Sequence, residues 1–545
     1  MNYLGFEKQL LVLSIAFSSS LWGSSSAFAF VSTLPSASLT QEALSAVQSD
    51  HSVKSLLGNG SISTLHPSQR VSETELSTIK FQHYYHGIEV IGSMVYHQVG
   101  KAGAKVVNRL ADFDLDVQPA LSETQAIEIA LSATNGSRVK SPPRLKILPE
   151  AVGDSAQLIY EVDIETMGGL GSRQVTIDAH SGALIANLSK QIAIAPTQIY
   201  SADHIGLDIE TLGGRTPKTA TGCDAVDLAS GNIEKSLTAA ECNNLDGEKD
   251  LLATTKCQFT INGIPQKYDV STCPLADAGA DASATRAERN SQAVLNYYQT
   301  HQNRNSFDDN GSPLISIVHA GARFANALWD QDGKFMFYGD GDGEKTGDFT
   351  QGLDIAGHEM THGVTDATAR LTMMGESGAI NEANSDFFGI IIASQATSGE
   401  TDWKIGKEVF LHPGPQSAIR DLANPGNISF CIAGSNGQCT DLRPDPDKIS
   451  EMMPIPAPGA VTCDDSNDNC WIHFNATILG HAAYLVSQAI TPKLAERLYY
   501  LTLTQSLSAR DNLVTAAKAY KQTCAQVYDK NTCSQVTAAF AQVGL

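Results

Sequence analysis

The chain has 545 residues, too many for one ordinary domain, and its 42% hydrophobic and 18% charged residues fit soluble domains with substantial cores. Acidic residues outnumber basic ones by 59 to 37, which gives a net charge of −22. Because this charge repels phosphate backbones, the composition argues against nucleic acid as a partner.

The N-terminus has the pattern of a secretory signal peptide. Lys8 precedes an apolar run from Leu10 to Phe17, and Ala27-Phe28-Ala29 supplies the small-x-small pattern that signal peptidase cleaves. The alternative is a membrane anchor, but the run is too short and too rich in serine to span a bilayer. We therefore expect residues 1–29 to be removed and the protein to be secreted, without a membrane partner.

Residues 30–195 alternate strand and helix signals and contain no cysteine. A capping box, Ser122-x-x-Gln125, predicts a helix directly after it. Stretches rich in Tyr, Val and Ile predict strands within residues 81–99, 158–164 and 174–177, and a turn follows at residues 180–182. We expect a small α+β region that folds separately from the cysteine-containing part after it.

All ten cysteines lie between Cys223 and Cys533, and several form close pairs. Such pairs close small disulfide loops in an oxidising compartment. Pairs of cysteines can also bind zinc, but the CxxC-type spacing that this needs is absent. The connectivity stays open; the close pairs are Cys431/Cys439, Cys463/Cys470 and Cys524/Cys533.

Helical patterns dominate the second half of the chain. Residues 274–283 are expected to be a loop, and Thr285 with Glu288 forms a capping box for the helix after it. From about residue 352 the pattern is mainly helical, with further helix starts expected at Thr491-Pro492 and at Ser508-x-x-Asp511.

A His-Glu-x-x-His pattern is formed by His358, Glu359 and His362. Two histidines four residues apart lie on one face of a helix, so both imidazoles can bind one ion. Glu359 lies on the adjoining edge, where its carboxylate could take a proton from water. A pattern with three fixed positions also occurs by chance, so the assignment depends on further residues.

Glu382 is a third candidate ligand, with nineteen residues between it and His362, enough for an antiparallel helix to present its carboxylate. Two histidines and a glutamate with an open fourth position are typical of catalytic zinc. Asn381 and Asp386, on the same predicted helix, could bind the distal nitrogens of the ligand histidines. Both could instead be caps or face solvent.

His473 precedes a helix that is expected to start near Ala476. Such a histidine would by itself be structural. Beside a zinc site it becomes a candidate for stabilising an oxyanion, with Asp468 as the residue that orients it.

Together these motifs resemble the thermolysin family of bacterial neutral metalloproteases. The resemblance covers roughly residues 286–545, in order and with compatible spacing. It implies an α+β protease with two lobes, a β-rich N-terminal lobe over residues 196–353 and a helical C-terminal lobe over residues 354–545. The motifs that carry it are HEMTH, GAINEANSD, DNCWIHFN, NALW and YGDGDG.

The resemblance also implies the roles of the central residues. His358, His362 and Glu382 would bind one catalytic Zn2+ ion, Glu359 would act as general base and later as proton donor, and His473 would donate a hydrogen bond in the transition state.

The substrate side follows from the same resemblance. Asn326 and Ala327 would bind the backbone of a protein or peptide substrate, and Arg420 would grip its carbonyl group. The pocket for the residue after the scissile bond is apolar, which implies cleavage before bulky hydrophobic residues. Its residues would be Phe349, Ile355, Val409 and Ile419.

Residues 30–195 resemble the propeptide of this family, with a fungalysin/thermolysin-type segment over residues 30–118 and a PepSY-like segment over residues 119–195. This implies a self-cleaving zymogen whose propeptide aids folding and blocks the cleft; the mature enzyme is expected to be a monomer. Two junctions stay open, Gln191/Ile192 and Gln198/Ile199, because both put a hydrophobic residue after the cut.

One departure from the family concerns the oxyanion. The family usually has a tyrosine eleven residues after the second ligand histidine, and that position is Met373. A thioether cannot donate a hydrogen bond, and losing one such donor raises the barrier by about 2.7–4 kcal/mol. A tyrosine from elsewhere in the chain could substitute.

A second departure concerns calcium. Asp354 and Asp402 match two carboxylates of the family's main calcium site, but Ala393, Lys404 and Lys407 replace the others. We expect the main site to be lost, because a hard cation needs six or more oxygen ligands. Our hypothesis is that a lysine ammonium takes the ion's place and pairs with Asp354 or Asp402. The alternative is that the lysines point to solvent and calcium binds weakly.

Two other functions compete with the endopeptidase. One is a catalytically impaired, zinc-containing binding protein on the same scaffold, which Met373 alone supports. The other is a zinc exopeptidase, which would need a group that holds a free terminus; the sequence gives no such signal.

Overall fold

The computed structural model describes the greater part of the chain. The predicted signal peptide and the junction Gln198/Ile199 lie outside the described residues. Those residues are 37–57, 62–134, 138–149, 156–165, 172–193, 222–227, 232–238, 251–252, 258–261, 264–269, 282–318, 324–332, 334–397, 401–414, 417–433, 439–456 and 461–545.

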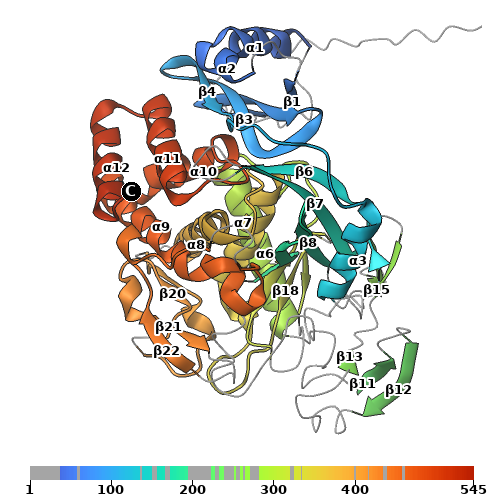
Figure 1. Ribbon diagram of the computed structural model, residues 1–545. Coiled ribbons are helices and arrows are strands. Elements are labelled where there is room, and N and C mark those ends of the chain that lie inside the picture. Colours follow the sequence, from blue (N-terminus) through green and yellow to red (C-terminus); the bar gives the residue numbers. More distant parts are fainter. Residues whose placement is uncertain are drawn as a thin grey trace, which may run out of the picture.

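A nine-stranded sheet forms the N-terminal region (Figure 1). Its elements are α1 (Ala37–Ser49), α2 (His51–Leu57), β1 (Ser63–Ser72), β2 (Leu76–Tyr85), β3 (Ile88–Gly100), β4 (Gly103–Arg109), α3 (Glu123–Thr134), β5 (Arg138–Val139), β6 (Arg144–Pro149), β7 (Ala156–Glu165), β8 (Ser172–Asp178) and β9 (Leu184–Ser189). β3 joins two halves, because it pairs antiparallel with β2 and β4 and parallel with β6. α1 and α2 share one small core with β2 and β3, and α3 shares another with β6, β7 and β8.

Short sheets and one long helix follow. They comprise β10 (Gln191–Ala193), β11 (Gly222–Asp227), β12 (Asn232–Thr238), β13 (Leu251–Leu252), β14 (Gln258–Ile261), β15 (Ile264–Asp269), α6 (Ala282–His301), β16 (Ile315–Ile317), β17 (Ala327–Asp330) and β18 (Phe335–Tyr338). β17 pairs antiparallel with β18 on one side and with β10 on the other, and β16 completes this four-stranded sheet.

The C-terminal part is mainly helical. Its helices are α7 (Leu353–Ala367), α8 (Gly375–Thr397), α9 (Asp468–Ile490), α10 (Pro492–Gln505), α11 (Leu513–Val527) and α12 (Lys530–Gln542). Its strands and short 3-10 helices are η2 (Phe349–Gln351), β19 (Lys404–Ile405), η3 (Lys407–Val409), β20 (Arg420–Asp421), η4 (Pro425–Asn427), β21 (Ser429–Ala433), β22 (Cys439–Pro444), η5 (Ile449–Glu451) and η6 (Asp465–Asn467). Among the described residues, no helix is both long and apolar enough to cross a bilayer.

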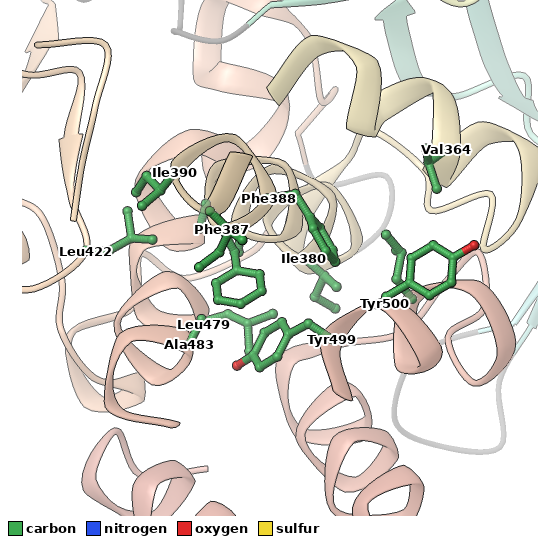
Figure 2. Packing of buried hydrophobic residues seen from close by; sticks show 14 of the residues in the cluster. Val364, Ile380, Phe387, Phe388, Ile390, Leu422, Leu479, Ala483, Tyr499 and Tyr500 are labelled. Atoms are coloured by element: carbon green, nitrogen blue, oxygen red, sulfur yellow. The ribbon is translucent and has the colours of Figure 1, made fainter. Parts of the chain in front are cut away.

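α8 lies at the centre of this part. Every residue from Ser377 to Ile392 is buried, so the helix is enclosed on all sides. Phe387 and Phe388 pack among side chains from α9 and α10, including Leu479 and Tyr499 (Figure 2). The buried polar residues of α8 therefore need partners inside the protein.

The N-terminal sheet docks on the helical part. Thr78 of β2 donates to the Gln505 side chain at 2.8 Å, and Tyr96 of β3 donates to the Leu507 carbonyl at 3.3 Å. Arg109 forms an ion pair with Asp511. In Figure 1 the blue strands lie beside α10 and α11.

The α+β fold with a β-rich part followed by a helical part is confirmed, as are several local predictions. The strands expected within residues 81–99 are β2 and β3, and the capping box holds α3, with Gln125 N donating to Ser122 Oγ at 3.3 Å. The helix predicted after Thr491 is α10.

Three expected helix starts are wrong. α6 begins at Ala282, before Thr285, so the last two residues of the loop predicted over residues 274–283 are helical, and the rest of that loop lies outside the described residues. Ser508 does not open a helix, because Asp511 Oδ2 accepts from Ser508 N at 2.9 Å and the carboxylate also pairs with Arg109; α11 starts after its cap Asn512. His473 lies inside α9 rather than before it, because the right-handed part of that element begins directly after the left-handed residues that end at Trp471.

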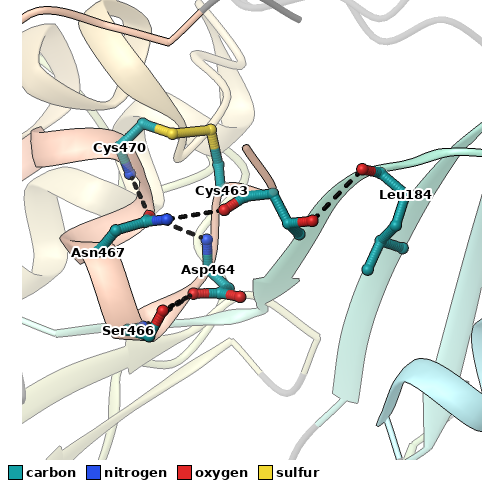
Figure 3. Close-up of a disulfide and its surroundings, with 7 residues drawn as sticks. Leu184, Cys463, Asp464, Ser466, Asn467 and Cys470 are labelled. Carbon is teal, nitrogen blue, oxygen red and sulfur yellow. Dashed lines mark hydrogen bonds between the residues drawn. A yellow bond between two sulfur atoms is a disulfide. The ribbon is translucent and has the colours of Figure 1, made fainter. Parts of the chain in front are cut away.

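Two of the three close cysteine pairs are disulfides, Cys463–Cys470 and Cys524–Cys533. The side chains of Cys431 and Cys439 lie outside the described part. The first disulfide precedes His473, and its loop contacts β9: Ala186 forms a bridge with Cys463, and Thr462 donates to the Leu184 carbonyl at 3.4 Å (Figure 3).

Candidate active site

Three buried side chains from two packed helices converge on one point. α7 presents His358 and His362 one turn apart, and α8 presents Glu382. The two Nε2 atoms are 2.9 Å apart, each lies 3.4 Å from a Glu382 oxygen, and all three ligand atoms lie within 4.8 Å of one another.

Glycine lets the two helices approach closely enough for this. A Cβ on Gly389 of α8 would lie 2.4 Å from the Asp354 carbonyl of α7, and a Cβ on Gly357 would lie 3.0 Å from the Gly389 Cα. Neither position has space for a side chain, so the sequence places glycine where α7 and α8 touch.

Polar residues of α8 contact the distal nitrogens of both histidines. His358 Nδ1 lies 2.9 Å from Asp386 Oδ1, and His362 Nδ1 lies 3.0 Å from Asn381 Oδ1. Because each Nδ1 faces an oxygen acceptor, it carries the proton, and both Nε2 lone pairs point into the shared space.

The residues present fit a zinc ion. The two Nε2 atoms lie 2.9 Å apart, and their lone pairs repel each other unless a cation lies between them. Both Glu382 oxygens are buried and accept no hydrogen bond from any described residue. Burial raises the pKa of the Glu382 carboxyl, but its contacts with His473, His362 and His358 outweigh burial and lower the pKa to about 2. A site with two neutral imidazoles and one anionic carboxylate is a typical zinc donor set.

Glu359 lies next to this point with a free carboxylate. Both oxygens are buried and have no hydrogen-bond partner within the described ranges. Burial raises the pKa of Glu359 well above its usual range, with Glu382 adding to the effect and His358 opposing it. A carboxylate with raised proton affinity close enough to His358 and Glu382 to feel their charges suits proton transfer.

His473 reaches the site from α9. Its Nε2 lies 3.5 Å from Glu382 Oε2, while Nδ1 hydrogen-bonds Asp468 Oδ1. Burial lowers the pKa of His473, but Glu382 and Asp468 raise it by more, so the net change is upward. The predicted orienting residue and the predicted oxyanion donor are thus in contact.

Two family descriptions match adjoining parts of the chain. The catalytic domain of thermolysin metallopeptidases matches residues 223–366, and their alpha-helical domain matches residues 369–545. The chain belongs to the thermolysin family. It is a metalloendopeptidase, and residues 120–188 match the peptidase propeptide and YPEB domain.

Thermolysin-family relatives resemble almost the whole chain. Bacillolysin from Bacillus amyloliquefaciens is 28% identical over 542 residues, covering 94% of this chain and 92% of its own. Thermolysin from Bacillus sp. (strain EA1) is 27% identical over 510 residues, covering 88% and 85%. Among solved structures, the precursor of protealysin from Serratia proteamaculans is 26% identical over 52% of this chain and 84% of its own, with a TM-score of 0.43.

The residues predicted to bind substrate in this thermolysin-family enzyme lie on several elements. Asn326 is buried directly before β17, and Ala327 is the first residue of that strand. The four residues of the predicted pocket are all buried within one apolar core; they are Phe349, Ile355, Val409 and Ile419.

Arg420 of β20 is buried beside the ligand helix. Its Nε and Nη2 donate to the two Asp386 oxygens, each at 2.6 Å, and Nη2 lies 3.5 Å from Glu382. Burial opposes this charge, but Asp386 raises the pKa of Arg420. Arg420 therefore holds the carboxylate that orients His358; a contact with substrate remains a prediction.

β10 occupies the edge of β17. Ala193 faces Leu328 and Ile192 faces Trp329 in an antiparallel register. An extended peptide binds a protein in the same way when it adds a strand to a sheet edge. The junction Gln191/Ile192 therefore lies in a strand paired with the predicted substrate-binding strand.

Sequence reasoning missed two contacts beneath the zinc ligands. Met373 Sδ accepts from Asn381 Nδ2 at 3.0 Å, and Ser385 Oγ lies 3.2 Å from His362 Nδ1. Ser385 is four residues after Asn381, a spacing that puts both on one helix face and could have indicated it. Met373 gave no such signal.

The region of the family's main calcium site contains lysine contacts. Lys407 forms an ion pair with Asp402, and Lys404 Nζ lies 4.0 Å from Asp421. Asp354 accepts from Gly406 N at 2.6 Å, and burial raises its pKa to about 6. One of the two pairings that the lysine hypothesis named is present; the loss of calcium stays a prediction.

Proposed function

We propose that this metalloendopeptidase is secreted as a self-processing zymogen and cleaves proteins before bulky hydrophobic residues. The observation that carries the activity is the convergence of His358, His362 and Glu382 beside the unbonded carboxylate of Glu359. The domain division would be a signal peptide over residues 1–29, a propeptide over residues 30–195 and a mature enzyme over residues 196–545.

The chain's residues divide the chemistry among them. When bound, zinc would lower the pKa of a water molecule and polarise the peptide carbonyl. Glu359 takes the proton from the attacking water and passes it to the leaving amine. His473, held by Asp468, donates a hydrogen bond to the oxygen that gains charge.

The apolar pocket supports the substrate preference. Phe349, Ile355, Val409 and Ile419 are buried and apolar, so a charged side chain placed there would lose its hydration without a partner. A large aliphatic or aromatic residue after the scissile bond would instead bury apolar surface.

The strand pairing supports inhibition by the propeptide. β10 lies where an extended substrate would pair with β17, so a protein substrate and β10 compete for one edge. Cleavage at a junction near this strand would release that edge.

The test compares the purified chain with its Glu359→Gln variant on casein, with and without a zinc chelator. We expect the variant to bind zinc but to lose both proteolysis and self-processing, because a carboxamide cannot take the proton. Sequencing of the product termini should show Leu, Ile or Phe after each cut. Full activity of the variant would refute the base assignment; an inactive wild type with bound zinc would favour the impaired binding protein, and single-residue release would favour the exopeptidase.

A further inference from the structure

Four consecutive residues before His473 have left-handed backbone conformations. Asp468, Asn469, Cys470 and Trp471 have φ angles of 54°, 47°, 64° and 70°. None is glycine, and a left-handed residue with a side chain costs roughly 1–2 kcal/mol. A run of four persists only where the surroundings hold it, and such strain is concentrated at functional sites.

The Cys463–Cys470 disulfide closes a loop that contains the first three residues of this left-handed turn, and Trp471 follows it directly. Inside the loop, Asn467 Oδ1 accepts from Cys470 N at 2.9 Å, and Asn467 Nδ2 donates to the Thr462 carbonyl at 2.7 Å (Figure 3). Asn469 N donates to the Asp464 carbonyl at 2.8 Å. The disulfide is the covalent member of this set, and Cys470 is fully buried.

The turn folds the Asp468 carboxylate back onto His473. Asp468 Oδ2 accepts from His473 N at 3.0 Å while Oδ1 bonds the ring nitrogen Nδ1. This double contact points His473 Nε2 toward Glu382 at 3.5 Å. The ligand residues come from α7 and α8, which lie outside the disulfide loop.

We infer that the Cys463–Cys470 disulfide is a positioning element of the active site, because it holds the left-handed turn that aims His473 at the reacting oxygen. The inference rests on the proposed role of His473. Breaking the disulfide lets the strained turn relax, so the Asp468–His473 contact loosens while the zinc ligands stay in place.

The propeptide strengthens the same loop before processing. Cys463 N donates to the Ile185 carbonyl at 3.3 Å, and Asn187 N donates to the Cys463 carbonyl at 3.1 Å. These bonds are lost when the propeptide leaves. The mature enzyme therefore depends on the disulfide more strongly than the zymogen does.

The experiment compares two matched disulfide removals in the processed enzyme, C463A/C470A and C524A/C533A. The first should lower kcat by about 10- to 100-fold, a usual loss when a group that orients an active-site residue is removed, with KM and zinc content unchanged. The second, which links α11 to α12, should leave kcat unchanged.

A double-mutant cycle shows whether the effect acts through His473. In a His473→Ala background, C463A/C470A should cause no further fall in kcat, because the oriented group is already absent. An additive fall would overturn the inference, as would an unchanged kcat in the C463A/C470A enzyme, a loss of zinc, or an equal effect of the control pair.

If C463A/C470A does not fold, reduction of the folded enzyme replaces it. A dithiol converts the disulfide to two thiols, and labelling identifies which cysteines have been freed. Activity should fall in step with labelling of Cys463 and Cys470, with zinc retained, and return on reoxidation. Undiminished activity with both thiols labelled overturns the inference, whereas an inactive wild-type enzyme would instead refute the proposed function.

Discussion

Lys80, in the proposed propeptide, makes the docking of this region sensitive to pH. Its ammonium group is buried on β2 and donates to the Thr368 carbonyl at the end of α7 at 3.2 Å. Burial, with smaller contributions from Arg370 and Arg109, lowers the pKa of Lys80 from 10.5 to about 7. A neutral amine can still donate the hydrogen bond, so the contact survives deprotonation.

The size and sign of the effect follow from linkage. The docked form binds fewer protons than the unfolded form between pH 7 and pH 10.5, so stability rises with pH across this window and is lost as pH falls toward 7. Two pKa values this far apart change the contribution of Lys80 by about 2.7 kcal/mol between pH 6 and pH 9.

Urea unfolding of the full chain carrying Glu359→Gln measures this contribution without self-processing. Lys80→Met removes the titrating group at similar length, and Lys101→Met, an exposed lysine of the same region, is the control. We expect the free-energy difference between the Lys80→Met chain and its parent to change by about 2.7 kcal/mol between pH 6 and pH 9. An identical difference at both pH values, or the same change for Lys101→Met, would refute the reasoning.

Two further predictions concern the surroundings of the zinc site. Met373→Leu removes the sulfur that accepts a hydrogen bond from Asn381, so the amide that orients His362 loses an acceptor. Competition with a chelating dye should show that zinc binds roughly tenfold more weakly. An unchanged zinc Kd would contradict the role of this contact. Treatment with a chelator that binds calcium in preference to zinc should leave the Tm unchanged, because Lys407 pairs with Asp402 where the family has carboxylates around a calcium ion. Calcium found by elemental analysis, or a fall in Tm, would contradict this prediction.

The candidate zinc site could be predicted from the sequence because the spacing of its residues is local. Histidines four residues apart share a helix face in any α-helix, and α8 brings Glu382 within reach of α7. Asn381 and Asp386 could be selected for the same reason, because their helix is buried and polar groups there need partners. The close contact of the two helices at Gly357 and Gly389 is seen only in the structure, because helical periodicity does not show which residues of two helices touch.

The turn before His473 could not be predicted. Asp468-Asn-Cys-Trp contains no glycine, so the sequence does not indicate a run of left-handed residues. The disulfide and hydrogen bonds of the folded loop hold the residues in this conformation. The helix start predicted at Ser508 was wrong for a related reason. Its partner Asp511 also binds Arg109, a residue 402 positions away, and local capping rules do not include such contacts.

The proposed propeptide contacts three separate elements that carry the candidate active site. Lys80 and Gln69 donate to carbonyls at the end of α7, Thr368 and Ala367, at 3.2 and 3.1 Å. β10 pairs with β17, and β9 pairs with the loop of Cys463. These elements are far apart in the chain, so bringing them together costs much loop-closure entropy. A preformed sheet that contacts all three elements lowers this cost.

The same geometry separates folding from later stability. Once α7, α8 and α9 have packed into one core, the burial of that core and the Cys463–Cys470 disulfide hold the site without the propeptide. The contacts that remain necessary after cleavage are therefore those within the catalytic part. Of the three elements that the proposed propeptide contacts, only the loop before His473 is closed by a disulfide. Removing this disulfide is therefore expected to have the largest effect on catalysis.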